Sequence, residues 1–250
     1  RICQVNDAFC RMLGYTREEL LTMSISDLEA TETSKQVADH IQKVINWGGS
    51  DRFETRHRRK DGNIIDVEVS TRMIEISSRL SFFCFVRDIT EYKRAKVELE
   101  REQNNLKAIF EAAPFCMLLV DENMVIKRSN SIVAKLFSKD ALEIANTRPG
   151  EGLGCIHASD DIKGCGYGPA CSSCLIRNTA RQVLSSGQAI HRVEIHPTFL
   201  VDGKAVSSWF EISVEPTVIE GCKHVVITMA DISERKKAED EVRRLNVKLE

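Results

Sequence analysis

Two stretches of this chain repeat each other, and this duplication constrains the fold more than any other feature of the sequence. The segment VNDAFCRMLGYTREEL at 5–20 aligns with SNSIVAKLFSKDALEI at 129–144, with asparagine on asparagine and apolar residues at helical spacing. Further on, FVRDITEYKRA at 85–95 aligns with TMADISERKKA at 228–238. A unit that occurs twice within 250 residues predicts two domains of one architecture.

Each copy has the pattern of two short strands, several short helices and three longer strands. Asp61-Gly62 and Asp202-Gly203 occupy matching positions and predict hairpin turns between strand-like runs. Asn130 predicts the N-cap of a helix over 131–137. Strand-like runs of the second copy lie at 115–120, 124–128, 190–198, 206–216 and 223–230. We therefore expect an α+β fold in which each copy is an antiparallel five-stranded sheet with helices on one face, the first copy lacking its N-terminal strand.

These strings carry a family resemblance. VNDAFCRMLGYTREEL, RFETRHRRKDGNIIDVEVS at 52–70 and FVRDITEYKRA resemble a PAS domain with its C-terminal PAS-associated motif, and MADISERKKAEDEV at 229–242 repeats this ending. Over nearly its whole length, the chain is similar to the tandem PAS modules of bacterial-type sensor histidine kinases. The expected parts are a first PAS domain over 1–91, a helical linker over 92–110, a second PAS domain over 111–233 and a C-terminal signalling helix over 234–250.

The resemblance implies a sensory role in a cytoplasmic two-component phosphorelay, upstream of a kinase or cyclase output domain in the same protein. In the last helix, Ala238, Val242, Leu245 and Leu249 recur at the alternating four- and three-residue steps of a coiled coil. A rougher seam of the same kind runs through the linker. We therefore expect a homodimer that forms through the linker helices.

Charge and motif content exclude several other classes. The formal net charge of −2 leaves no global basic field to hold nucleic acid or an anionic membrane. No apolar run approaches the roughly 20 residues that cross a bilayer. The chain shows no pairing of nucleophile with base and no metalloprotease motif. We therefore expect a regulatory segment that is not itself an enzyme.

Four of the nine cysteines lie within GCIHASDDIKGCGYGPACSSC at 154–174, inside an insertion over 150–177 that lengthens the second copy. Their spacing is Cys155-x9-Cys165-x5-Cys171-x2-Cys174, in which a C-x-x-C pair can reach one metal from a single turn. The interspersed glycines allow positive φ and a close backbone approach. We predict that these four cysteines ligate a metal centre, with His157 as an alternative ligand.

Three interpretations of this cluster stay open at the level of sequence. The first is a metal centre, and the second is a thiol–disulfide switch through Cys171 and Cys174. In the third, the cysteines have no chemical role and only pack within the loop. The uneven spacing favours an iron–sulfur cluster over zinc, because structural zinc sites usually use two close pairs. The stretch GCGYGPACSSCLIR at 164–177 resembles a cysteine-rich PAS subclass of sensor kinases, which implies sensing of redox state, oxygen or metal supply. The rival is a PAS dimerisation scaffold with a purely structural zinc.

Overall fold

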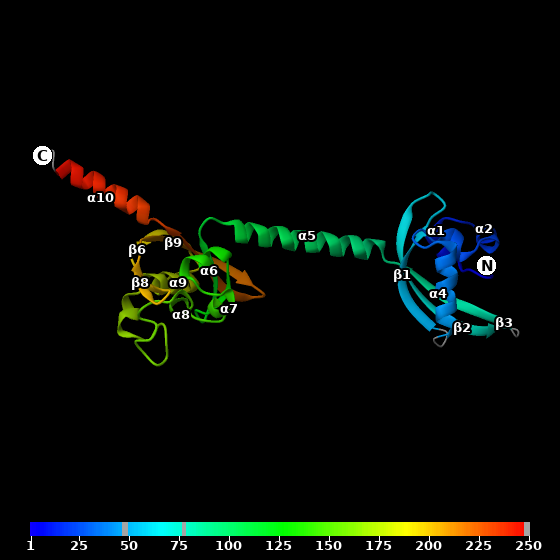
Figure 1. The fold of residues 1–250 in the computed structure, drawn as a ribbon, viewed down its shortest axis with the longest axis horizontal. Helices are drawn as coiled ribbons and strands as arrows, with labels where there is room; N and C mark the ends of the chain where they lie inside the picture. Colours follow the sequence, from blue (N-terminus) through cyan, green and yellow to red (C-terminus); the bar gives the residue numbers. More distant parts are fainter. Residues whose placement is uncertain (47–49, 77–78, 248–250) are drawn as a thin grey trace. The chain divides into compact units, whose positions relative to one another are not determined.

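The computed structural model describes residues 1–46, 50–76 and 79–247, and the chain divides into two units, Arg1–Gln103 and Asn104–Glu250. Both units combine antiparallel sheets with helices (Figure 1), which confirms the α+β class. The boundary falls within helix α5 (Thr90–Ala112), where the sequence predicts a helical linker. The predicted C-terminal helix is α10 (Ser233–Val247), and residues 248–250, including Leu249 of the predicted seam, lie outside the described part.

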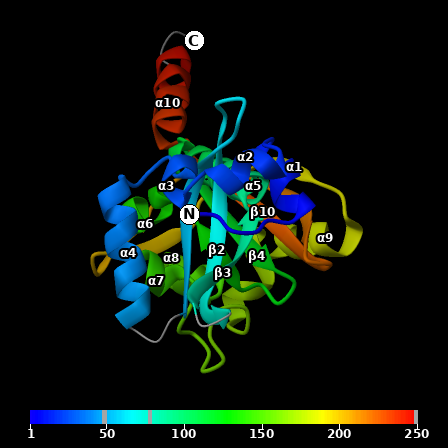
Figure 2. The same cartoon turned by 90° about the vertical axis from the view of Figure 1, so that its right-hand side faces the viewer.

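In the described part of the first unit, short helices precede a three-stranded antiparallel sheet of order β1-β2-β3. The elements are α1 (Asp7–Leu13), α2 (Arg17–Thr22), α3 (Ile25–Leu28), α4 (Ser34–Asn46), β1 (Ser50–Arg58), β2 (Ile64–Ile76) and β3 (Arg79–Asp88). Helix α4 runs alongside the sheet (Figure 1 and Figure 2). Asn6 begins α1 by accepting the N–H of Phe9 at 2.9 Å. The core joins helical leucines to the sheet and consists of Ile2, Leu13, Leu20, Leu28, Ile65, Val67 and Val69.

In the described part of the second unit, five antiparallel strands form a sheet of order β5-β4-β10-β9-β6, and β7 and β8 form a separate hairpin. The strands are β4 (Cys116–Asp121), β5 (Ile126–Ser129), β6 (Ile190–Ile195), β7 (Thr198–Val201), β8 (Lys204–Ser207), β9 (Phe210–Ile219) and β10 (Cys222–Asp231). The helices are α6 (Ser131–Phe137), α7 (Ala141–Ile144), α8 (Pro149–Leu153), the 3-10 turn η1 (Pro169–Ser173), α9 (Leu175–Ser186) and α10. The predicted five-stranded sheet is therefore present in this unit.

One face of that sheet is covered by α9. Burial alternates along β4 and β10, and α9 contacts both β9 and β10. Ile176, Ala180 and Val183 are buried on α9 at the i, i+4, i+7 spacing of one helix face. Gly187, with a φ of 69°, ends this helix in the left-handed conformation that glycine adopts without strain.

Asn130 occupies the predicted N-cap position of α6, but its side chain does not cap the helix. Its Oδ1 accepts the N–H of Met117 at 3.0 Å, and its Nδ2 donates to the carbonyl of Phe115 at 2.9 Å. Glu111 replaces it by accepting the N–H of Ser131 at 2.8 Å. The buried side-chain amide of Asn130 pairs with backbone groups at the beginning of β4 and does not cap α6. Leaving those buried groups unpaired would be costly.

The sheets differ from the expectation in two details. The described residues of the first unit form three strands, whereas the five-stranded pattern without its N-terminal strand leaves four. In the second unit, the predicted strands 190–198 and 206–216 each break into two, at 196–197 and at 208–209. Pro197 has no N–H for a sheet ladder, and the backbone of Trp209 pairs with the beginning of α10, since the N–H of Ile232 donates to its carbonyl at 2.9 Å.

None of the described helices combines the length and apolar character needed to cross a bilayer.

Candidate metal centre

A cavity of about 560 Å³ in the second unit is lined by Cys155, Cys165, Cys171 and Cys174, and we name it the cysteine cavity. Its walls come from α8, the loop that follows it, the first two turns of α9, the turn between β4 and β5, and the bend between β6 and β7. Most of the first three lie within the insertion over 150–177. The fold thus brings all four predicted ligands to the edge of one space.

Cys155 is held by backbone hydrogen bonds to two walls of this cavity. Its own N–H donates to the carbonyl of Gly150 in α8 at 2.7 Å. It also lies opposite Phe199 in an antiparallel bridge, beside which the N–H of Leu200 donates to the carbonyl of Gly154 at 2.7 Å. The position of Cys155 is therefore tied directly to the beginning of β7.

Cys165 packs on the backbone of α8. A Cβ atom at Gly150 would lie 2.6 Å from the Sγ of Cys165, so only glycine leaves room for that side chain. The N–H of Cys165 donates to Glu151 Oε1 at 3.1 Å, and the other oxygen of that carboxylate accepts the N–H of Arg148 at 3.2 Å. Glu151 thereby fixes the loop to α8, a role that the sequence alone did not reveal.

Cys171 and Cys174 occupy a turn of 3-10 helix and the residue that precedes α9. Cys171 is buried, and its Sγ accepts the N–H of Gly166 at 3.3 Å. Cys174 is the N-cap residue of α9. The N-terminus of a helix carries partial positive charge, so α9 presents that charge at this wall of the cavity.

Burial raises the pKa of the Cys155 and Cys165 thiols above the usual 9.0. The backbone amides of His157 and Gly150 act in the opposite direction on Cys155 and Cys165 respectively, and charge on the neighbouring cavity cysteines raises both pKa values further. The thiols are thus close enough to repel one another once ionised. A cation among them would remove that penalty, because metal binding replaces the protons of its thiol ligands.

Three arginines also line the cysteine cavity: Arg148, Arg177 and Arg181. The guanidinium of Arg177 packs against Gly166, where a Cβ atom would lie 2.8 Å from its Nε. Positive charge at the wall offsets the net negative charge that a metal ion with four thiolate ligands carries. The i, i+4 spacing of Arg177 and Arg181 was the signal in the sequence that could have placed both on one face of α9.

His157, the alternative ligand, lies at the rim of the cavity. Its Nδ1 lies 2.8 Å from Asp160 Oδ2, and its side chain is 46% exposed. A carboxylate beside one ring nitrogen orients the imidazole, as it does for histidines around many metal sites. Ligation by His157 stays a prediction.

Within the ranges 1–46, 50–76 and 79–247, no three histidine, cysteine, aspartate or glutamate side chains are placed to hold one metal ion. A single zinc ion would need its thiolates about 2.3 Å away, all around one point. The four cysteines share a cavity, and their ligation of a metal stays a prediction.

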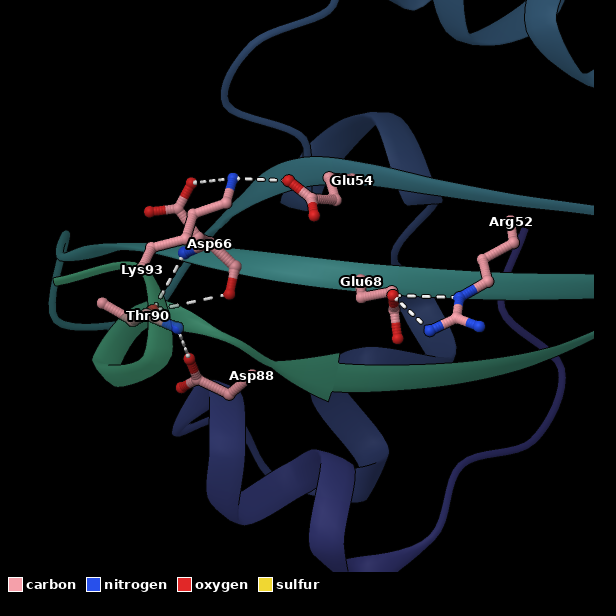
Figure 3. A network of polar contacts seen from close by, with 7 residues as sticks. All are labelled: Arg52, Glu54, Asp66, Glu68, Asp88, Thr90 and Lys93. Carbon is pink, nitrogen blue, oxygen red and sulfur yellow. Dashed lines mark hydrogen bonds and ion pairs between the residues drawn. The ribbon is translucent and has the colours of Figure 1, made fainter. Parts of the chain in front are cut away.

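A set of contacts at the beginning of α5 holds that helix to the first unit (Figure 3), and we name it the first clamp. The N–H of Asp66 donates to Thr90 Oγ1 at 3.0 Å, and the N–H of Thr90 donates to Asp88 Oδ1 at 2.9 Å. Lys93 completes the set by binding Asp66 at 3.2 Å and Glu54 at 2.8 Å.

The second clamp holds the beginning of α10 in the same manner. The N–H of Trp209 donates to Ser233 Oγ at 3.1 Å, and the N–H of Ser233 donates to Asp231 Oδ1 at 2.8 Å. The Nζ of Lys236 lies 5.4 Å from the centroid of the Trp209 ring and 2.6 Å from Glu194 Oε2. Both copies therefore end in one local geometry.

Residues 1–91 match the PAS domain family. This match confirms the PAS prediction for the first copy. A methyl sulfide methyltransferase-associated sensor of Methanosarcina acetivorans is 35% identical over 105 residues, which are 42% of this chain and 10% of that protein. The sensor histidine kinase TmoS of Ectopseudomonas mendocina is 27% identical over 116 residues, 45% of this chain and 12% of that protein. The chain thus spans only about a tenth of these relatives.

Among solved structures, the PAS domain of a two-component sensor histidine kinase is 36% identical, with a TM-score of 0.30. That alignment covers 34% of this chain and 73% of the other. Together, the family match and these relatives make the chain a PAS-containing segment similar to parts of sensor proteins.

Proposed function

We propose that this chain is the sensory segment of a cytoplasmic two-component sensor kinase, built from two tandem PAS domains. The second domain belongs to a cysteine-rich subclass and holds a metal centre on Cys155, Cys165, Cys171 and Cys174. The observation that carries this proposal is that the fold brings all four cysteines to the wall of one cavity.

Three further features of the cavity support a metal centre. Backbone amides reach the sulfur atoms of Cys155, Cys165 and Cys171, which is the environment that metal-bound thiolates need. Arginine side chains and the beginning of α9 supply positive charge. The uneven spacing of the four cysteines favours an iron–sulfur cluster over a single zinc ion, because structural zinc sites usually use two close pairs.

The centre would report redox state, oxygen or metal supply through its own loss or oxidation. Losing it frees the insertion over 150–177, whose residues form the cavity walls. Binding of structural zinc to small domains is worth roughly 10 kcal/mol or more. A centre of comparable affinity outweighs a difference of a few kcal/mol between two signalling states.

Output and dimerisation complete the proposal. Helices α5 and α10 expose apolar side chains, among them Val97, Leu106 and Ile109 on α5 and Val242 and Leu245 on α10. A second copy of the chain covers such seams in a homodimer. The signal then passes along α10 to a histidine kinase domain, or alternatively a cyclase, in the same protein.

A thiol–disulfide switch is the second candidate, because Cys174 precedes α9 directly and Cys171 lies three residues before it. The two cysteines of a C-x-x-C pair can form a disulfide with each other and exchange it with other thiols. This candidate predicts loss of free thiols on oxidation without any bound metal. A dimerisation scaffold with structural zinc would instead lose thermal stability, with unchanged signalling, when Cys171 becomes serine.

Anaerobic purification followed by visible absorption, metal analysis and thiol counting tests the proposal. We expect iron and sulfide in stoichiometric amounts with a broad visible band, lost in Cys171→Ser and retained in Cys222→Ser. Cys222 is an exposed cysteine outside the cavity and serves as the matched control. Stoichiometric zinc would select the zinc site, and a metal-free protein with all thiols reactive would contradict the proposal.

A further inference from the structure

The bend between β6 and β7 has the cysteine cavity on one side and the second clamp on the other. Residues 195–199 line the cavity, and the neighbouring Glu194 binds Arg235 at 2.7 Å and Lys236 at 2.6 Å. A stretch of six residues therefore contacts both the proposed sensor site and the first turn of α10.

One contact joins these two sides through side chains. The imidazole of His196, a cavity-lining residue, stacks on the indole of Trp209 with centroids 4.6 Å apart and an interplanar angle of 18°. The backbone of Trp209 holds both Ile232 and Ser233 at the entry to α10. Its ring also makes a cation–π contact with the ammonium group of Lys236. Movement of His196 therefore displaces a residue that fixes the beginning of the helix.

The backbone joins the cavity to the same bend. The N–H of Ile156 donates to the carbonyl of Thr198 at 3.3 Å, one residue from the Cys155–Phe199 bridge. The N–H of Ser208 donates to the carbonyl of Pro197 at 3.4 Å, next to Trp209. A shift of Cys155 thus moves residues 196–198, which contact Ser208 through the backbone and Trp209 through the ring of His196.

We propose that the His196–Trp209 stack transmits the state of the cysteine cavity to the first turn of α10. His196 and Trp209 are positioning residues, because they act on α10 without ligating the metal. With the cavity filled, the bend is held and Trp209 keeps Ile232 and Ser233 in place. With the cavity empty, the bend shifts and the first turn of α10 loosens. This inference rests on the proposed function, since it takes the cavity to be the site of the signal.

Hydrogen–deuterium exchange of the amides at 232–236 tests the coupling in the whole 250-residue chain. The chain is loaded anaerobically with ferrous iron and sulfide, and a second sample is stripped with EDTA. In the wild type we expect stripping to raise exchange of these amides about fivefold or more. His196→Ala is expected to abolish this difference with the visible absorption of the loaded sample unchanged.

Two variants separate coupling from general damage. His191→Ala changes an exposed histidine on β6, the strand that leads into the bend, and this residue does not line the cavity, so the variant keeps the full response. His196→Phe retains a ring that stacks on Trp209, so it restores the response. A full response in His196→Ala with intact absorption would overturn the proposal, as would loss of the response in His191→Ala.

Failure of the metal proposal is distinguishable from failure of the coupling. If no wild-type sample takes up iron, the same exchange is measured before and after iodoacetamide alkylates the cavity thiols. A chain with serine at 155, 165, 171 and 174 corrects for the other cysteines. A rise in exchange that His196→Ala abolishes supports the coupling and rejects the iron–sulfur cluster. An equal rise in both chains, or no rise in the wild type, overturns the coupling as well.

Discussion

The two clamps differ at one residue in the middle of an otherwise matching set of contacts. Asp66 and Trp209 are equivalent positions of the two units. The backbone N–H of Asp66 donates to the hydroxyl of Thr90, and that of Trp209 donates to the hydroxyl of Ser233, the first residues of α5 and α10. In the first unit, Asp66 adds a carboxylate that binds Lys93 (Figure 3). In the second unit, Trp209 adds a ring that contacts the ammonium group of Lys236 and stacks on the imidazole of His196.

The difference shows how one fold can hold a helix with or without a connection to a ligand cavity. The carboxylate of Asp66 completes an ion-pair set with Glu54 and Lys93. The indole of Trp209 extends the corresponding set to the wall of the cysteine cavity. In the second unit, Trp209 therefore connects the wall of the cysteine cavity to α10. At the corresponding position of the first unit, the carboxylate of Asp66 binds Lys93 instead.

The largest expected effect is confined to the second unit and follows from Gly150→Val. The new side chain would occupy the space of Cys165 Sγ, 2.6 Å from the position of a Cβ atom. We expect metal content to fall by more than about tenfold, as when the surroundings of a metal site are disturbed. Metal analysis of anaerobically purified protein measures it. Gly203→Asn is the control, because a Cβ there meets nothing within 4 Å and asparagine tolerates the positive φ of this position. Wild-type metal content in Gly150→Val would contradict the prediction.

The next effect tests whether each unit has its own core. Phe137 is buried against Phe199 and Phe210, with ring centroids 4.9 and 6.4 Å away, so Phe137→Ala should lower the free energy of unfolding by about 3–5 kcal/mol. Denaturant unfolding should show this loss in the transition of the second unit alone. Leu13→Ala, with a cost of about 2–5 kcal/mol, should shift only the other transition. One shared shift in both variants would show that the units unfold together.

A third effect concerns the pH dependence of metal binding. Because the pKa values of Cys155 and Cys165 are raised above 9.0, both thiols are protonated in the free protein at neutral pH. Each must lose its proton to bind metal, so affinity should rise by about tenfold per pH unit for each thiol until pH passes the raised pKa. Zinc titration against a competing chelator at pH 6 to 8 measures this slope. Affinity independent of pH would exclude these thiols as ligands.

The smallest effect concerns Glu194, the acidic residue of the second clamp that binds Lys236. The hydrogen bond from Lys236 lowers the pKa of Glu194 below its usual 4.5. A carboxylate with a lowered pKa contributes stability that is present above the usual pKa and is lost as pH falls through the lowered one. The first turn of α10 should therefore hold above pH 4.5 and loosen below it, as followed by amide chemical shifts. Glu194→Gln should remove this transition, and an unchanged transition in that variant would assign it to another group.

Local signals explain how much of this structure could be predicted from the sequence. Asp202-Gly203 and the helix beginning at Ser131 depend on neighbours in the chain, and both lie where the pattern places them. Asn130 bonding to β4, and Trp209 pairing with α10, depend on strands that meet only after folding. The spacing of the four cysteines indicated a common site. The arginines and Glu151 around them come from elements whose packing no local pattern encodes.

The most direct test of the account is X-ray absorption spectroscopy at the metal edge of the anaerobically purified chain. We predict four sulfur neighbours per metal atom, with neighbouring iron atoms in the shell beyond them, and a decrease in sulfur coordination in Cys171→Ser. A lone zinc ion with four sulfurs at about 2.3 Å would keep the site and replace the cluster. A first shell of oxygen and nitrogen, or no bound metal at all, would contradict the claim that these four cysteines hold a metal centre.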